Sequence, residues 1–196
     1  LAYYDVQWDN LQSNLSCTFL GLLCVVNVGE ASSTGIEADL RGQVTDNLGL
    51  SISYTYNDSE LENLSDNAQE FIDDGTLFAD LNLGGRLPGA SENTVYLGAT
   101  YEQNLSDGMA LLYAVNGSYR SEAESSLFSN STKLDSFWLW NAGVSLVSEQ
   151  WTVRAFVNNI DDERGLLGAD PVGPWGPRAN AVVSTPRTYG LTASFR

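Results

Sequence analysis

The sequence predicts an all-β protein, an eight-stranded antiparallel up-and-down meander that belongs to the wall of a transmembrane barrel. Apolar and polar side chains alternate, the strands are about ten residues long, and the connections are of two kinds. The clearest pair of strands is Gly35–Tyr56, with the turn-forming run Thr45-Asp46-Asn47 between its arms. Successive strand side chains point to opposite faces, so its apolar residues collect on one side. Each arm has the ~9–11 residues that a tilted strand needs to cross a bilayer, and a charged opposite face is typical of a barrel lumen.

The N-terminal half contains four expected strands. The first alternates Tyr4, Val6 and Trp8 with polar residues, and a loop that carries both cysteines follows it to about Val26. The expected elements are the strands Leu1–Gln12, Gly35–Val44, Leu48–Asn57 and Thr94–Tyr101, a long acidic loop Asp58–Pro88 and a short helical turn within that loop near Ala68–Ile72.

The C-terminal half contains the other four strands, each with the same alternation. Its last long loop holds Pro171, Pro174 and Pro177, which argue against regular sheet there. The expected elements are the strands Met109–Tyr119, Phe137–Val147, Trp151–Asn159 and Thr188–Arg196, the tight turns Ser106-Asp107-Gly108 and Ser148-Glu149-Gln150, and the loops Ser121–Ser136 and Ile160–Val183.

Tight turns and long loops alternate along the chain. An up-and-down meander must place all tight turns on one rim and all long loops on the other, an asymmetry typical of bacterial outer-membrane barrels. Aromatic residues near strand ends are expected to form interfacial girdles. They are Trp8, Tyr56, Tyr101, Tyr119, Trp138, Trp151, Tyr189 and Phe195.

Composition narrows the function. The 196 residues carry 25 acidic and 9 basic side chains, a net charge of −16, which argues against a nucleic-acid partner. The acids gather in the expected loops, which favours a solvated surface. The alternative is a cation-attracting mouth or contacts with divalent ions. The longest apolar run, Phe19–Val26, is too short for a membrane-spanning helix, which needs ~20 residues.

The chain has no histidine, which excludes serine–histidine and cysteine–histidine catalysis and most zinc sites. A lipase or protease barrel would need a serine–lysine or acidic-dyad site, and Lys133 is the only lysine. We therefore expect no enzyme activity, no cofactor and no metal site. The two cysteines, Cys17 and Cys24, are expected to form a disulfide in an oxidising compartment, with two free thiols as the alternative.

Five short motifs in order resemble the TonB-dependent outer-membrane receptors. They cover nearly the whole chain, which resembles the C-terminal third of that family's barrel. In the motif Leu87-Pro88-Gly89 before Thr94, Ser91 stands where the family usually has proline. The motifs are Tyr3-Tyr4-Asp5-Val6-Gln7-Trp8, then Asn27-Val28-Gly29-Glu30-Ala31 with Ser33, Gly35, Ile36 and Glu37, Leu87-Pro88-Gly89 before Thr94, Val157-Asn158-Asn159-Ile160-Asp161-Asp162, and Arg187-Thr188-Tyr189-Gly190-Leu191.

The resemblance implies a barrel of about 22 strands in the bacterial outer membrane, among lipid and lipopolysaccharide. It implies import of a scarce ligand such as a ferric siderophore, through an N-terminal plug and with energy from TonB. Residues 1–196 are expected to be one barrel segment, without the plug or the TonB-contacting box. The family commonly ends on an aromatic residue read by the barrel-assembly machinery, whereas Arg196 follows Phe195 here.

The alternative is a self-contained eight-stranded outer-membrane barrel with a structural or adhesive role. Eight strands enclose an interior just wide enough for side chains. The inward residues here are mostly small, and a closed ring would bury the charges of Glu37, Asp39, Arg41, Arg154 and Arg196. We therefore expect an open, curved wall whose first and last strands do not pair.

Overall fold

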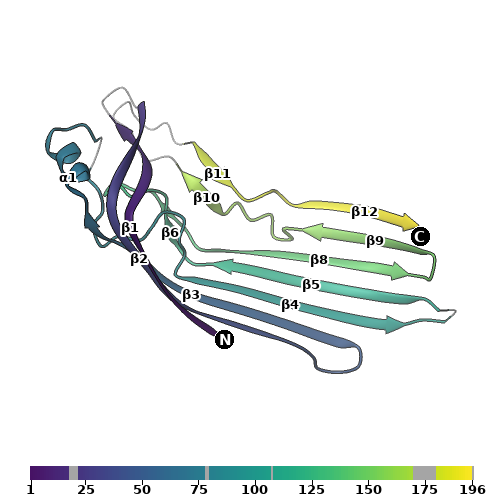
Figure 1. Ribbon diagram of the computed structural model, residues 1–196. Helices are drawn as coiled ribbons and strands as arrows, with labels where there is room; N and C mark the ends of the chain where they lie inside the picture. The colour runs from purple at the N-terminus through teal and green to yellow at the C-terminus, as the bar shows by residue number, and fades with distance from the viewer. Residues whose placement is uncertain (18–21, 78–79, 107, 170–179, 196) are drawn as a thin grey trace.

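The protein is one curved, open antiparallel sheet with small elements at one end (Figure 1). The computed structural model describes residues 1–17, 22–77, 80–106, 108–169 and 180–195. The eight-stranded sheet has the order β1-β2-β3-β4-β5-β8-β9-β12. Its strands are β1 Ala2–Cys17, β2 Leu22–Gln43, β3 Leu48–Leu64, β4 Asn93–Asn104, β5 Ala110–Arg120, β8 Phe137–Val147, β9 Trp151–Asn158 and β12 Thr188–Phe195.

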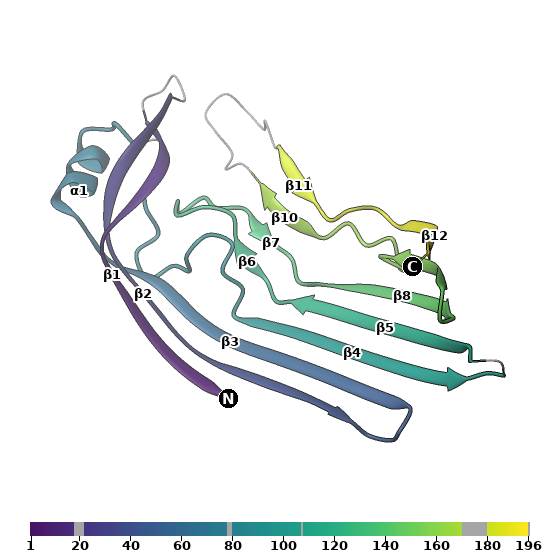
Figure 2. The ribbon, with the colours of Figure 1, turned by 45° about the vertical axis from the view of Figure 1, so that its right-hand side comes forward.

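The order of the strands follows the chain, so the predicted meander is confirmed. Strands β1 and β12 are the two edges of the sheet, on its opposite sides in Figure 2. The sheet is therefore open, as expected, and the closed eight-stranded ring is not formed. No described helix is long and apolar enough to cross a membrane.

The two rims differ as predicted. The short turns β2–β3, β4–β5 and β8–β9 lie together at the right-hand end in Figure 1. All the longer connections lie at the other end. Asp107, within the predicted second turn, lies outside the described residues. The small elements of the loop end are the helix α1 Asp66–Asp73, the pair β6 Ala123–Glu124 with β7 Lys133–Leu134, and the pair β10 Leu166–Ala169 with β11 Ala181–Val183.

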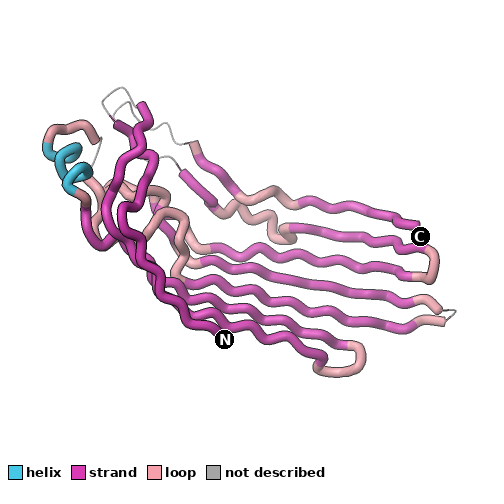
Figure 3. Tube along the Cα trace, viewed as in Figure 1, coloured by secondary structure: helices cyan, strands magenta, loops and turns pink. Residues whose placement is uncertain are grey.

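Helix α1 is the only helix of the described chain, the cyan segment in Figure 3, and confirms the helical turn expected near Ala68–Ile72. Its N-cap is Ser65, whose side chain accepts a hydrogen bond from the Ala68 backbone N–H. This cap satisfies one of the free donors of the first turn. The prediction that Ile160–Val183 contains no sheet is wrong in part, because β10 and β11 pair there. Its three prolines lie outside the described residues.

The first three strands are longer than predicted. β3 continues through Asp58–Leu64, which the sequence assigned to a loop, and β1 and β2 also extend into the predicted cysteine loop. The sequence pattern misses this extension because the side of β3 that is buried changes along the strand. Beyond Tyr56 the even positions carry acids, while Ser59 and Leu61 on the other face become buried. The apolar side therefore changes without any break in the strand.

Backbone irregularities lie near this change of surroundings. The β1–β2 register shifts between Trp8 and Leu11, where Asn10 has a φ of 59°. Opposite, Gly29 has a φ of 132°, and the β2–β3 register shifts at Glu30 and Ala31. A bulge adds a residue to one strand, and the residues beyond it then point to the other face. The β1–β2 hairpin thus turns a new apolar side toward α1.

Candidate functional site

One face of the sheet, called here the apolar face, is apolar across all its central strands. Its middle is marked by the row of cross-strand partners Leu40, Ile52, Leu97, Gly117 and Trp140. Directly paired residues share a face, so the register confirms the predicted separation of apolar from polar residues. Leu40 is 70% exposed to the surroundings, as a residue in contact with lipid would be.

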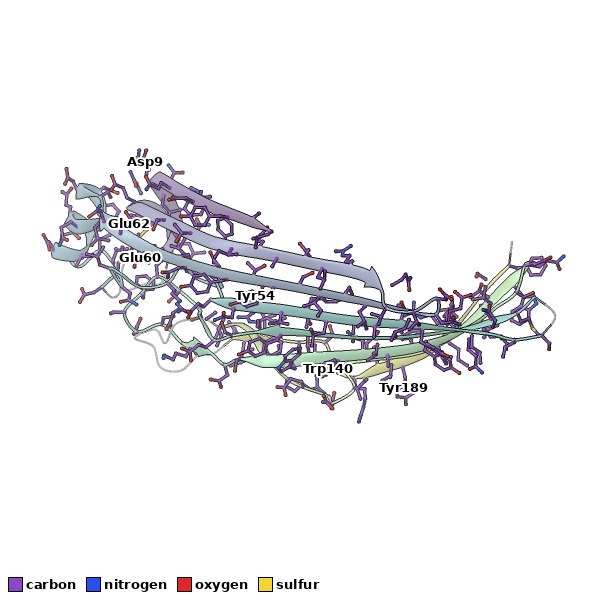
Figure 4. All side chains as sticks on the ribbon, turned by 90° about the horizontal axis from the view of Figure 1, so that it is seen from below. Asp9, Tyr54, Glu60, Glu62, Trp140 and Tyr189 are labelled. Carbon is purple, nitrogen blue, oxygen red and sulfur yellow. A yellow bond between two sulfur atoms is a disulfide. The ribbon has the colours of Figure 1, made fainter. Side chains whose placement is uncertain are left out.

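Aromatic residues border the apolar face at two levels. Tyr101 and Tyr113 lie toward the turn end, with ring centroids 6.2 Å apart. Tyr119 and Trp138 lie toward the loop end, 5.1 Å apart, and Trp138 stacks on Trp140. At ~3.3 Å per residue, Tyr113 and Tyr119 are roughly 20 Å apart along β5, comparable to the apolar band of an outer-membrane barrel. Figure 4 labels Tyr54, Trp140 and Tyr189 on this wall.

One girdle prediction is wrong. Trp8 pairs with Ala31, which lies on the polar face together with Ser33 and Gly35. Tyr4, on the same face, covers Gly35 and donates a hydrogen bond to Asn57 Oδ1 at 2.9 Å. Alternation separates the two sets of side chains but does not say which set faces lipid, and this strand has aromatic residues in both sets.

The polar face carries small and amide side chains. Asn116, Asn141 and Asn158 are successive cross-strand partners on β5, β8 and β9. Asn141 Nδ2 donates to Asn116 Oδ1 at 2.9 Å, and Ser53 Oγ donates to Asp39. Glu37, Asp39 and Arg41 share this face by the register, as predicted. Arg196 lies outside the described residues.

At the loop end, the hairpin β1–β2 and β3 pack against α1 and the segments that follow it. This loop core is the best buried part of the described chain, and Val26, Val28 and Leu61 are completely inaccessible. Its buried members are Leu15, Cys17, Val26, Val28, Leu61, Ala68, Leu77, Leu81, Leu127 and Phe128. The long connections are thus held in place by a small hydrophobic core of their own.

A polar pocket of about 220 Å³ lies beside this core. It is lined by side chains of both charges, and Arg86 within it forms an ion pair with Glu92. The sequence did not predict that these residues come together, because they belong to separate loops. The lining residues are Asn82, Gly85, Arg86, Glu122, Ala123, Glu124 and Lys133.

Asn159 holds the last long connection. It is 5% exposed and has a φ of 51°, which asparagine tolerates better than most residues. Its Nδ2 donates to the backbone oxygens of Glu163 and Thr185, both at 2.8 Å, and its Oδ1 accepts from the Glu163 N–H. Asp162 accepts a hydrogen bond from the Arg187 N–H. The motif Val157–Asp162 is therefore a structural clamp on the connection between β9 and β12.

The bond from the Arg187 N–H, with Arg164 beside it, lowers the pKa of Asp162 below its ordinary value. A lowered folded-state pKa stabilises the fold above the unfolded-state pKa, and that stabilisation is lost as the pH falls through the folded-state value. We therefore expect the clamp to weaken in acid and to hold at neutral pH.

We expect Asn159→Ala to destabilise the receptor that contains this chain by about 2 kcal/mol, because two carbonyls and one N–H lose their partner. The midpoint of urea unfolding in lipid vesicles measures this. Asn158→Ala is the control, because Asn158 is exposed and makes only a 3.3 Å contact with Thr188. Equal midpoints for the two variants would contradict the clamp.

Cys17 and Cys24 lie at the facing ends of β1 and β2, and not in an irregular loop as expected. Their Cα atoms are 5.8 Å apart, within the usual range for a disulfide. The bond itself stays a prediction, and mass spectrometry of non-reduced peptides tests it. We expect a linked peptide pair and a stabilisation of about 2 kcal/mol. Alkylation of both thiols in freshly isolated membranes would contradict it.

The acids of β3 lie at the loop end, where Figure 4 labels Glu60 and Glu62, with Asp9 of β1 nearby. Among the described residues, no three histidine, cysteine, aspartate or glutamate side chains form a group that could hold a metal ion.

An open wall with one apolar face, two aromatic levels, short turns on one rim and long loops on the other defines a transmembrane β-barrel segment of the outer-membrane class. A family model described as "TonB dependent receptor-like, beta-barrel" matches residues 1–160. The chain belongs to the TonB-dependent receptor family. A comparison with curated proteins gave no match.

Solved structures agree in fold. The siderophore receptor PiuA from Acinetobacter baumannii is 20% identical, with a TM-score of 0.66, over 96% of this chain and 24% of that chain. The ferric preacinetobactin receptor BauA from the same organism is 18% identical, with a TM-score of 0.69, over 97% of this chain and 26% of that chain. The ferric yersiniabactin uptake receptor FyuA from Yersinia pestis is 16% identical, with a TM-score of 0.71, over 96% of this chain and 26% of that chain. This chain therefore spans about a quarter of each relative.

Proposed function

We propose that this chain supplies part of the barrel wall and external loops of a receptor that imports a ferric siderophore across the outer membrane, with energy from TonB. The observation that carries the proposal is the family match over residues 1–160, joined to an open sheet with a lipid-type face. Several solved relatives are named as receptors for ferric siderophores, which supports that ligand class.

In this proposal the apolar face contacts lipid, its loop end reaches lipopolysaccharide, and the polar face lines the lumen. The loop core fixes the external loops, and the polar pocket around Arg86 and Lys133 offers them a ligand-contacting surface. A plug in the lumen and TonB on the periplasmic side complete the receptor. The barrel-assembly machinery is expected to read the last strand. No part of this role requires catalysis.

The test uses the full-length receptor in a bacterial strain that lacks its own siderophore receptors. We expect uptake of at least one radiolabelled ferric siderophore from a panel. Comparison of strains with and without TonB distinguishes active import from leakage. Uptake that is equal in a strain without TonB, or no uptake from the whole panel with the receptor folded in the outer membrane, would contradict the proposal.

A further inference from the structure

Arg120 ends β5 on the polar face, next to Tyr119 of the loop-side aromatic level. Its guanidinium lies over the ring of Phe137, 5.4 Å from the centroid. Both Nε and Nη2 are buried and have no hydrogen-bond partner. Nη1 is not among those buried atoms, so the guanidinium is sealed along one edge and accessible at the other.

The wall itself supplies no acid to this guanidinium. The cross-strand partners of Arg120 are Thr94 and Phe137, neither of which carries a charge. The ion pairs found in the described part of the chain are Arg86 with Glu92 and Arg164 with Asp162. Glu122, two residues beyond Arg120, is exposed and makes no ion pair with it.

A guanidinium that has lost water without gaining an acceptor destabilises the protein that carries it. The cost is present whether or not a transported ligand is bound. A ligand that passes through cannot remove this cost between turnovers, whereas a resident group can. The acceptor that suits Arg120 is therefore part of the receptor. A planar carboxylate matches the guanidinium best, since it accepts two parallel N–H bonds.

The structure also says where that group must come from. Arg120 lies on the polar face of an open wall, next to Tyr119 of the loop-side aromatic level. This chain covers about a quarter of the length of these solved relatives, and most of each relative lies outside the matched part. We propose that Arg120 is a docking anchor for an aspartate or glutamate of the receptor segment that fills the lumen. This inference rests on the proposed function.

Docking through Arg120 would require only a small movement of its side chain. The exposed Nη1 edge makes the first contact, and rotation away from Phe137 frees Nε and Nη2 for the second bond. Phe137 itself is fixed, since a Cβ at Gly165 would lie 2.4 Å from its ring. The ring therefore holds the guanidinium at the end of β5 until an acid is present.

The test places a photoreactive p-benzoylphenylalanine at position 120 of the full-length receptor, with no siderophore present, and maps the cross-links by mass spectrometry. Arg154 is the matched control, because it also lies on the polar face beside a ring, 5.9 Å from Phe156, yet it is exposed. We expect position 120 to cross-link to a lumen segment outside residues 1–196, within a few residues of an acid. Cross-links confined to residues 1–196 would overturn the proposal.

A second measurement does not depend on the bulky probe. Arg120→Gln should speed protease cleavage of the lumen segment by about tenfold, and Arg120→Glu by more, because a charge pair is lost or reversed. Arg154→Gln and Arg154→Glu should stay within about twofold. Replacement of the cross-linked acid by arginine, combined with Arg120→Glu, should restore protection of the lumen segment from protease. Equal cleavage rates for the Arg120 and Arg154 variants, with heat-modifiable barrels in all, would overturn the anchor.

The failure of the anchor and that of the proposed function have different signatures. If the wild-type receptor imports no siderophore but position 120 cross-links to the lumen segment, the anchor stands and the ligand class is wrong. If the receptor imports a siderophore and the cross-links never leave residues 1–196, import stands and the anchor is wrong.

Discussion

Replacement of Leu40 by arginine should lower the stability of the membrane-inserted receptor by about 2–4 kcal/mol, the cost of a cation on the lipid face near the midplane. Leu40 pairs with Ile52, and this pair lies midway between Leu48, the partner of Tyr101, and Tyr56, the partner of Ile36. No acid lies in this apolar row to receive the guanidinium. Urea unfolding in lipid vesicles measures the loss, and heat-modifiability in outer-membrane preparations measures assembly.

The matched control is the adjacent residue on the other face. Asp39→Asn should leave assembly almost unchanged, because Asp39 faces the polar side and its amide analogue can still accept the hydrogen bond from Ser53. Assembly and heat resistance that are equal for Leu40→Arg and Asp39→Asn would show that the apolar face does not contact lipid.

The membrane-spanning part of the sheet could be predicted from the sequence because one environment acts on it throughout. Lipid on one side and polar surroundings on the other impose a period of two on every strand. For this reason the expected bounds of β8 agree with the structure, and those of β4, β5, β9 and β12 differ only near their ends. Short turns between β2 and β3, β4 and β5, and β8 and β9 limited the remaining freedom on one rim.

The loop end could not be predicted in the same way. There the strands leave the apolar band, and β3 carries acids where Tyr54 and Tyr56 had marked the lipid side. Burial in this region depends on packing between distant segments, since Leu61, Ala68 and Phe128 belong to one hydrophobic cluster. A pattern read along one strand contains no information about such partners, so a continuous strand looked like a loop.

The candidate site shows the same limit. The sequence identified the polar set that includes Asp39 and Arg41, since alternation alone defines it. It could not identify Arg120 as unpaired, because that depends on Thr94 and Phe137 being its neighbours. Asn159 was visible only as part of a motif, and its hydrogen bonds explain why an asparagine stands there.

The second large effect is expected at the bulge that turns the β1–β2 hairpin. Gly29 has a φ of 132°, a conformation that residues with a Cβ rarely adopt. A Cβ on Gly29 would also lie 2.0 Å from the backbone oxygen of Asn63 on β3. Backbone cannot move aside as a flexible side chain can, so Gly29→Ala must break the local pairing of β2 with β3.

We expect Gly29→Ala to destabilise the receptor by about 2–5 kcal/mol, the sum of backbone strain and overpacking. Since Val28 and Leu61 lie beside the bulge, the loop core should loosen first, and proteases should cleave the external hairpin while the barrel stays heat-modifiable. Gly42→Ala on the same strand is the control, because a Cβ there meets nothing within 4 Å. If both variants unfold at the same urea concentration, the bulge does not require a glycine at position 29.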